Sequence, residues 1–185
     1  GLGDVYKRQV VEHKAMLSQY YQDDTLHILA DKFINIDDSV NLNSLRGFGN
    51  VRFYKKDIQG LCDSISYKEK DSIMELFHSP FLWSDKNQIS GDFIQLKLWE
   101  GKINAMNIFN NSFILSMADS VHFNQIKGKD MFSQFFKNQL KTIHVVGNGE
   151  TIYYIESDSG ESSVDYNKTQ CSELTILLNL SLIHI

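Results

Sequence analysis

The sequence predicts an all-β protein in which a repeated unit of short strands stacks into a folded-over, solenoid-like sheet. Composition, residue periodicity and an internal repeat predict this fold. The chain has 185 residues, of which 42% are hydrophobic and 12% aromatic, with one proline and a net charge of −5. Aromatic and branched side chains pack well in strands, and a single proline interrupts few strand ladders. The acidic balance argues against a nucleic-acid partner.

The two ends of the sequence match a sequencing adapter better than a protein. With the codon choice GAT GTG TAT AAG AGA CAG for Asp4–Gln9, the reverse complement translates as Leu-Ser-Leu-Ile-His-Ile, which is the sequence of residues 180–185. All six positions match. We therefore expect residues 1–9 and 180–185 to be adapter translation, and residues 10–179 to form one β-repeat domain that is truncated at both ends.

The internal repeat is a small residue followed closely by an acid, with an apolar residue three positions after the small one. Successive copies are spaced by 32, 29, 37 and 43 residues. The copies are Ala30-Asp31-Phe33, Cys62-Asp63-Ile65, Gly91-Asp92-Ile94, Gly128-Asp130-Met131 and Cys171-Glu173-Leu174. A second half-repeat lies between them, beginning at residues 49, 79, 111 and 147. Short strands repeated at this spacing predict units that pair mainly with their neighbours.

Alternating apolar residues mark strands at residues 94–98 and 112–117, and an apolar run marks another at 151–155. Clusters of Gly, Asn, Asp and Ser predict turns between the strands, at residues 37–39, 47–50, 84–87, 110–111, 147–149 and 157–163. Residues 12–20 and 129–139 could each form a turn or two of helix, although neither has a clear cap and apolar stripe.

No catalytic motif stands out. The sequence has no zinc-ligand spacing, nucleophile elbow or phosphate-binding loop, so we expect no enzyme, no metal site and no cofactor. The recurrent acids could pair as glycosidase carboxylates, but repetition at one place in each unit is typical of a solvated turn. Cys62 and Cys171 occupy the slot that Ala30 fills, where crowded backbones favour a small side chain. Three repeat steps place the two cysteines about 14 Å apart, too far for a disulfide.

The apolar positions of the repeat predict one continuous inner face. This face is either a self-packed core or a groove that accepts an apolar ligand, and periodicity alone does not separate the two. Its candidate residues are Phe33, Val51, Phe53, Ile65, Ile94, Phe113, Leu115, Met131 and Leu174.

Several segments of the sequence resemble the OstA-like (LptA-type) lipopolysaccharide-transport family. They are residues 24–33 (DTLHILADKF), 49–51 (GNV) and 87–92 (NQISGD), while residues 123–131 and 147–154 are similar to later repeats of longer members. The resemblance implies a periplasmic β-taco or β-jellyroll whose interior holds the acyl chains of lipid A. It also implies a place in an inner-to-outer membrane bridge, through strand pairing with other bridge proteins or with further copies. The shifted acids in the last two repeats and the insertion at 157–163 depart from the family pattern.

We therefore expect a non-enzymatic lipid-transport module, associated with the periplasm and the outer membrane. Such a module must offset roughly 0.8 kcal/mol per CH₂ drawn from a membrane, or about 10 kcal/mol for a twelve-carbon chain. The alternative is a surface β-solenoid that acts as an adhesin or a polysaccharide-active enzyme. Its outer face should carry exposed aromatic residues and paired carboxylates.

Overall fold

The computed structural model describes residues 7–20, 24–37, 44–84, 86–100, 102–136, 139–155 and 165–178. These residues form fourteen antiparallel strands and no helix, which confirms the all-β prediction. The helical alternative is wrong at both places, since residues 12–20 lie in β1 and residues 130–136 in β12. Residues 15–20 pair with β2 and residues 130–136 with β13, and this pairing overrides any weak helix propensity.

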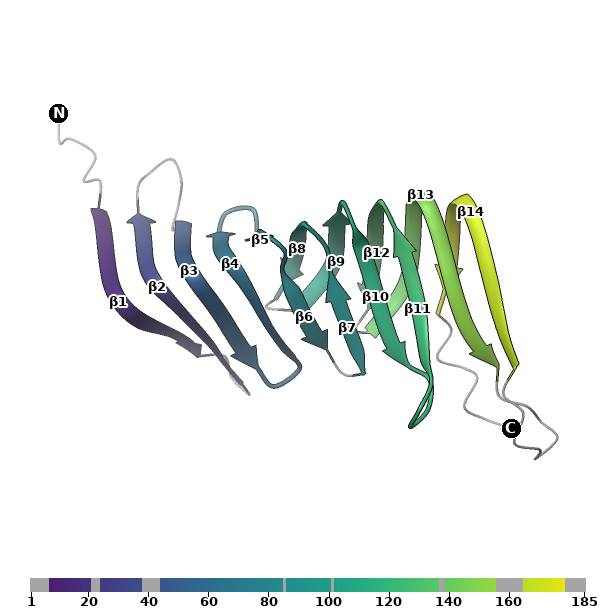
Figure 1. Cartoon of the computed structure of the whole chain (residues 1–185). Helices are drawn as coiled ribbons and strands as arrows, with labels where there is room; N and C mark the ends of the chain where they lie inside the picture. The colour runs from purple at the N-terminus through teal and green to yellow at the C-terminus, as the bar shows by residue number, and fades with distance from the viewer. Residues whose placement is uncertain are drawn as a thin grey trace.

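The strands follow one another along an elongated stack that runs from the N-terminal to the C-terminal end of the chain (Figure 1). Their bounds are β1 Lys7–Tyr20, β2 Thr25–Asp37, β3 Ser44–Lys55, β4 Ile58–Lys68, β5 Ile73–Phe77, β6 Phe81–Ser84, β7 Asn87–Ser90, β8 Phe93–Trp99, β9 Lys102–Phe109, β10 Ser112–Met117, β11 Phe123–Gly128, β12 Asp130–Phe136, β13 Gln139–Ile155 and β14 Asp165–Leu177.

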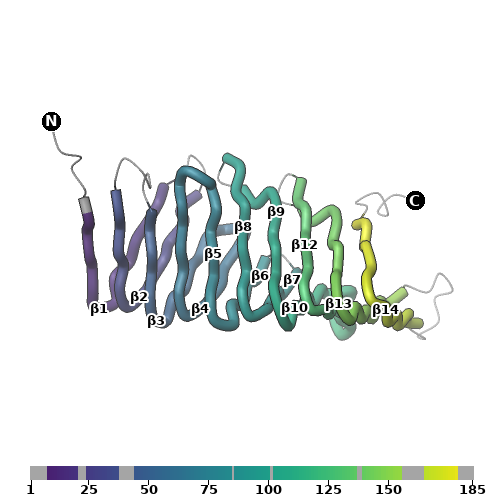
Figure 2. Tube along the Cα trace, turned by 90° about the horizontal axis from the view of Figure 1, so that it is seen from above, coloured from purple at the N-terminus to yellow at the C-terminus, as the bar shows by residue number. Residues whose placement is uncertain are grey.

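The sheet is folded over along one crease, so that two layers of strands face each other (Figure 2). At the crease the backbone enters the left-handed region in five pairs of residues, which are His13–Lys14, Gly49–Asn50, His78–Ser79, Asn110–Asn111 and Gly147–Asn148. Four of these pairs coincide with the second half-repeat of the sequence. Left-handed backbone favours Gly and Asn, which explains why these residues recur there.

The two layers are here called arm A and arm B. Arm A contains β5, β8, β9 and β12. Arm B contains β6, β7, β10 and β11, together with the segment of β4 that pairs with β6 and the segments of β3 and β2 that continue this layer. The long strands β4 and β13 cross the crease and pair with both arms, since β4 pairs with β5 and β6, and β13 pairs with β12 and β11. Ten strands therefore close into a ring, which β1–β3 and β14 extend at its two ends. This arrangement is compatible with a β-taco or β-jellyroll.

The small residues of the first half-repeat lie at the crease, where there is no room for a larger side chain. A Cβ atom added to Gly91 would collide with Ile108, and one added to Gly128 would collide with Val145. Cys62 is buried at the crease and is the cross-strand partner of Val51 on the neighbouring strand β3. Both cysteines are free thiols. They are separated by six strand steps, or about 29 Å, because each repeat adds two strands to an arm rather than one.

One row of apolar side chains runs across arm A from strand to strand. Successive cross-strand partners in this row are Ile65, Leu76, Ile94, Ile108, Met131, Val145 and Leu174. The sequence-predicted residues Ile65, Ile94, Met131 and Leu174 therefore lie in this row, each two strands from the next. Phe33, Val51 and Phe53 are also buried in the core.

The predicted inner position is wrong for Phe113 and Leu115. In β10 it is Ile114 that is buried, at 1% exposure, and it pairs with the inward-facing Ile89. Since successive residues of a strand face opposite sides, Phe113 and Leu115 lie on the outer face, and Phe113 pairs with the exposed Lys127.

The predicted chain ends and insertion fall partly outside the described residues. Lys7, Arg8 and Gln9 begin β1 and pair with Asp37, Ile36 and Asn35. Residues 1–6, 157–163 and 180–185 lie outside the described part of the chain.

Candidate functional site

Three of the recurrent acids of the repeat accept hydrogen bonds at the crease. The Asp31 carboxylate accepts a hydrogen bond of 2.7 Å from the Asn50 amide, and the two carboxylate oxygens of Asp92 accept from the Asn111 amide at 3.1 Å. Asp130, where the acid is shifted by one position, instead accepts a 3.0 Å bond from the Asn110 backbone N–H. These bonds hold the left-handed corners, which supports a structural role for the acids.

Next to the crease, the interior between the arms is filled by side chains. Ile94, Met131 and Val145 have no exposed surface, and Ile65 is only 2% exposed. In this part of the molecule the predicted inner face is therefore a packed core. A ligand reaches these positions only if the arms move apart.

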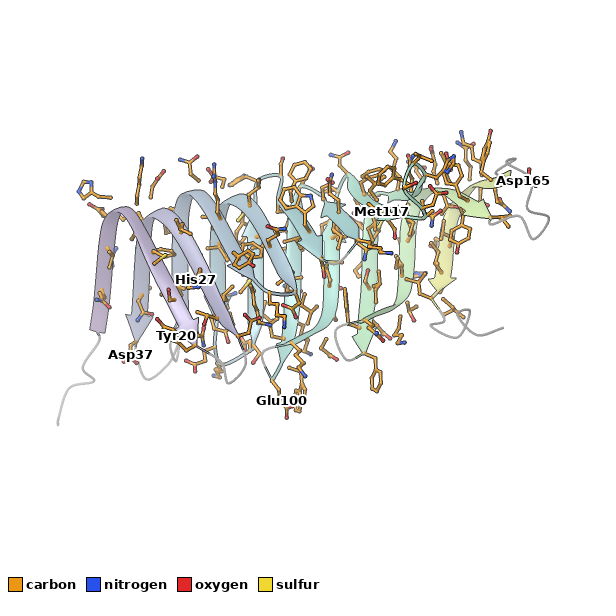
Figure 3. The ribbon with its side chains drawn as sticks, turned by 90° about the horizontal axis from the view of Figure 1, so that it is seen from below. Tyr20, His27, Asp37, Glu100, Met117 and Asp165 are labelled. Atoms are coloured by element: carbon orange, nitrogen blue, oxygen red, sulfur yellow. The ribbon has the colours of Figure 1, made fainter. Side chains whose placement is uncertain are left out.

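The interior opens further from the crease, toward the free ends of the strands. Tyr20, Asp37 and Glu100 all lie along this open side of the molecule (Figure 3). Three cavities lie along the interior, and we name them by their position in the stack. The N-terminal cavity has a volume of about 610 Å³, the central cavity about 370 Å³ and the C-terminal cavity about 520 Å³.

The central cavity lies between the arms and is mostly apolar. Arm A contributes five apolar side chains and arm B three, together with a rim of charged residues. The apolar lining residues are Met74, Leu96, Leu98, Ile103 and Phe135 from arm A, and Leu26, Phe53 and Ile58 from the strands of arm B. The charged lining residues are Lys55, Lys56, Asp57 and Lys102.

The C-terminal cavity has a similar apolar lining but a different rim. Ile114, Ile126, Leu140, Ile143 and Ile176 contribute to it, and its described lining residues include no Lys, Arg, Asp or Glu. The N-terminal cavity lies under β1 and is lined by Phe33, Leu17 and Leu45 among others, with one acid, Glu69.

The open side of arm B is polar, whereas arm A stays apolar out to the opening. Ser84, Asn87, Ser116 and Asn124 are successive cross-strand partners near the free end of arm B. The interior between the arms is therefore mostly apolar, with a row of hydrogen-bonding side chains along the open edge of arm B.

Ser133 of arm A is the one buried polar side chain of the described residues whose oxygen has no hydrogen-bond partner. It is 1% exposed and lies between its cross-strand partners Met106 and Ile143. An unpaired buried hydroxyl costs free energy, so this position weakens an otherwise apolar row.

The sequence-predicted residues divide into three groups. Phe33 lines the N-terminal cavity, Phe53 the central cavity and Leu174 the C-terminal cavity. Val51, Ile65, Ile94 and Met131 belong to the packed core near the crease. Phe113 and Leu115 are on the outside.

Sequence reasoning missed the residues at the opening. Leu96 and Leu98 continue the alternation that begins at Ile94, so the pattern could have identified them. Lys55, Lys56 and Lys102 carry no such signal, because they lie in and beside two turns that only the fold brings to one cavity.

In the described part of the chain, no group of three or more His, Cys, Asp or Glu side chains is placed to hold a metal ion. No helix among the described residues is long and apolar enough to cross a membrane. Comparison with known proteins yields neither a matching family model nor a matching curated protein sequence.

Proposed function

We propose that this chain is a non-enzymatic, periplasmic lipopolysaccharide-transport module that holds acyl chains in the trough between its two arms. The observation that carries the proposal is the trough itself: three cavities in a row along the interior, each lined by apolar side chains. The resemblance of the repeat segments to the OstA-like family supports the same function. The lipid is lipopolysaccharide, bound through its lipid A acyl chains.

The central cavity offers an acyl chain the apolar surface that it needs outside a membrane. Removing an acyl chain from a membrane costs roughly 0.8 kcal/mol per CH₂, and only contact with apolar surface offsets this cost. Eight apolar side chains line the central cavity, and the packed row behind them provides a continuous apolar floor. The acyl chain would lie against this apolar floor, with the polar head group of the lipid at the opening.

The partners in this proposal are other bridge proteins or further copies of the chain. The two outermost strands could make this contact, because among the described residues β1 pairs only with β2 and β14 only with β13. An unpaired strand edge is a template for another strand.

The alternative of an adhesin or a polysaccharide-active enzyme rests on the outer face. Four phenylalanines there, Phe77, Phe93, Phe109 and Phe132, form a chain of ring contacts with centroids 5.0 to 5.9 Å apart. These rings pack against one another along the sheet. The recurrent acids, which the alternative needs as paired carboxylates, are occupied in crease hydrogen bonds at Asp31, Asp92 and Asp130. The surface does carry exposed aromatic residues, among them Phe48, Tyr54 and Phe132. The hydrogen bonds of the recurrent acids are therefore what favours transport over the alternative.

Photocrosslinking tests the proposal. A photoreactive residue at Leu98, which lines the central cavity, should capture lipopolysaccharide. The same residue at Lys97, exposed on the outer face one position earlier, should not. Circular dichroism checks that both variants are folded. Equal capture at the two positions, or no capture at Leu98 in a folded protein, contradicts the proposal.

A second pair of variants separates binding from folding. Leu98→Asp should abolish capture from a probe at Ile103, because a charge there is incompatible with hydrocarbon. Leu98 is only partly buried, so the fold should survive. Lys97→Asp is the matched control and should leave capture from Ile103 unchanged.

A further inference from the structure

The rim of the central cavity is positive in a chain that is negative overall. Three of the four charged lining residues are lysines, although the whole sequence carries 23 acidic and 18 basic residues. Lys55 and Lys56 come from the end of β3 and the turn after it, and Lys102 from the start of β9 on the other arm. The two arms thus bring lysines from separate turns to one opening.

The charge of Lys55 is locally balanced. Its Nζ lies 3.2 Å from Asp57 Oδ1 and 4.0 Å from Asp24 Oδ2. The Asp24 carboxylate also accepts a hydrogen bond from the Lys56 backbone N–H at 3.1 Å, which fixes the turn. Lys55 and its two acids therefore form a structural cluster at the base of the rim.

Lys56 and Lys102 are different, since neither ammonium forms an ion pair with any acid in the described part of the chain. Both side chains are exposed, and both line the cavity from opposite arms. Glu100 lies in the same turn as Lys102 but does not line the cavity. Two lysines with no ion-pair partner among the described residues therefore line the rim of a mostly apolar cavity.

We propose that the central cavity binds an anionic amphiphile, with its alkyl chain between the arms and its anionic head between Lys56 and Lys102. Charge complementarity at the rim selects the head, and the apolar lining selects the chain. The C-terminal cavity, whose described lining residues carry no Lys or Arg, accepts chains without this selection. This inference rests on the proposed function and deepens it, because it assigns the head group to one place in the trough.

Calorimetry with two twelve-carbon amphiphiles of opposite charge tests the inference. Below their micelle concentrations, dodecyl phosphate should bind the full chain at least tenfold more tightly than dodecyltrimethylammonium. The net negative charge of the chain would by itself favour the cation, so the expected order is diagnostic. Equal affinity, or tighter binding of the cation, overturns the inference.

The lysines are tested by a double variant with a matched control. Lys56→Gln with Lys102→Gln should weaken dodecyl phosphate binding by tenfold or more and remove most of its salt dependence. Lys97→Gln with Lys127→Gln changes the net charge equally at exposed positions away from the cavity, and should stay within twofold of the unaltered chain. An unchanged affinity in the first variant overturns the inference.

Two further outcomes separate this inference from the proposed function. If both amphiphiles bind equally while Leu98 still captures lipopolysaccharide, the head-group site is wrong and the trough stands. If neither amphiphile binds to the folded chain and Leu98 captures nothing, the proposed function fails as well. Inorganic phosphate at the same concentration should not displace dodecyl phosphate, and displacement would mean that the lysines bind free phosphate instead.

Discussion

Burial at the crease changes the chemistry of a single thiol. Desolvation raises the pKa of Cys62 to about 12, and the neighbouring Asp63 carboxylate acts in the same direction. The thiolate is the reactive form of cysteine, so Cys62 stays unreactive near neutral pH. Cys171, at the equivalent position of the last repeat, is only partly buried, with its Sγ 3.9 Å from the Gly149 carbonyl oxygen.

The first prediction follows from this difference. At pH 8 and without reductant, iodoacetamide should modify Cys171 readily and Cys62 only after unfolding, as read by mass spectrometry. Because the folded-state pKa of Cys62 is raised, its contribution to stability is present below pH 9 and is lost as the pH rises toward 12. Equal rates at the two thiols, or a disulfide between them, would contradict the structure.

At the scale of strands, the two arms are joined by a series of similar bends along the crease. Each bend combines a left-handed pair of residues on one strand with a small residue on the next, and an Asn–Asp hydrogen bond closes two of the bends. The sequence repeat could be recognised because every bend needs the same two features. The number of strands per repeat could not be read from spacing alone, which is why the separation of Cys62 and Cys171 was underestimated.

In β10, the sequence periodicity does not predict which residues face the interior. Phe113, Ile114 and Leu115 are all apolar, so alternation does not determine which of them points inward. The structure turns Ile114 inward, because Ser112 is needed at the crease. The Ser112 hydroxyl shares its one proton between the backbone oxygens of Lys129 and Ile108, at 2.8 and 3.1 Å. In β8, by contrast, Gln95 and Lys97 alternate with apolar residues, and the face was predicted correctly.

The second prediction concerns the crease itself. Gly128→Val should destabilise the chain by about 1–3 kcal/mol, because any Cβ at this position overlaps the Val145 side chain. Denaturant unfolding measures the loss. Lys127→Val, one residue earlier and exposed on the outer face, is the control and should change stability by no more than about 0.5 kcal/mol. Similar losses in both variants would remove the steric explanation.

At the scale of the whole molecule, the stack has two open ends. The edge strand β1 exposes Val10, Met16 and Tyr20, and the edge strand β14 exposes Tyr166 and Leu177. Backbone groups on these edges have no partner strand among the described residues. The fold therefore extends naturally by adding a further strand at either end.

The third prediction is that the chain associates end to end. Sedimentation velocity should show a sedimentation coefficient that rises with protein concentration. Val11→Lys places a charge on the inner side of the edge strand, a device that blocks strand addition, and should reduce the association. A strict monomer at all concentrations would count against strand pairing as the means of partner contact.

In the proposed function, acyl chains occupy the interior between the arms. Electron paramagnetic resonance with a nitroxide label at Leu98 tests it most directly, with a label at Lys97 as the outward control. When lipopolysaccharide is added, the Leu98 label should become immobilised and lose its accessibility to a water-soluble nickel relaxant, while the Lys97 label should not change. Equal changes at both labels, or an unchanged Leu98 label in a folded chain, would contradict the account.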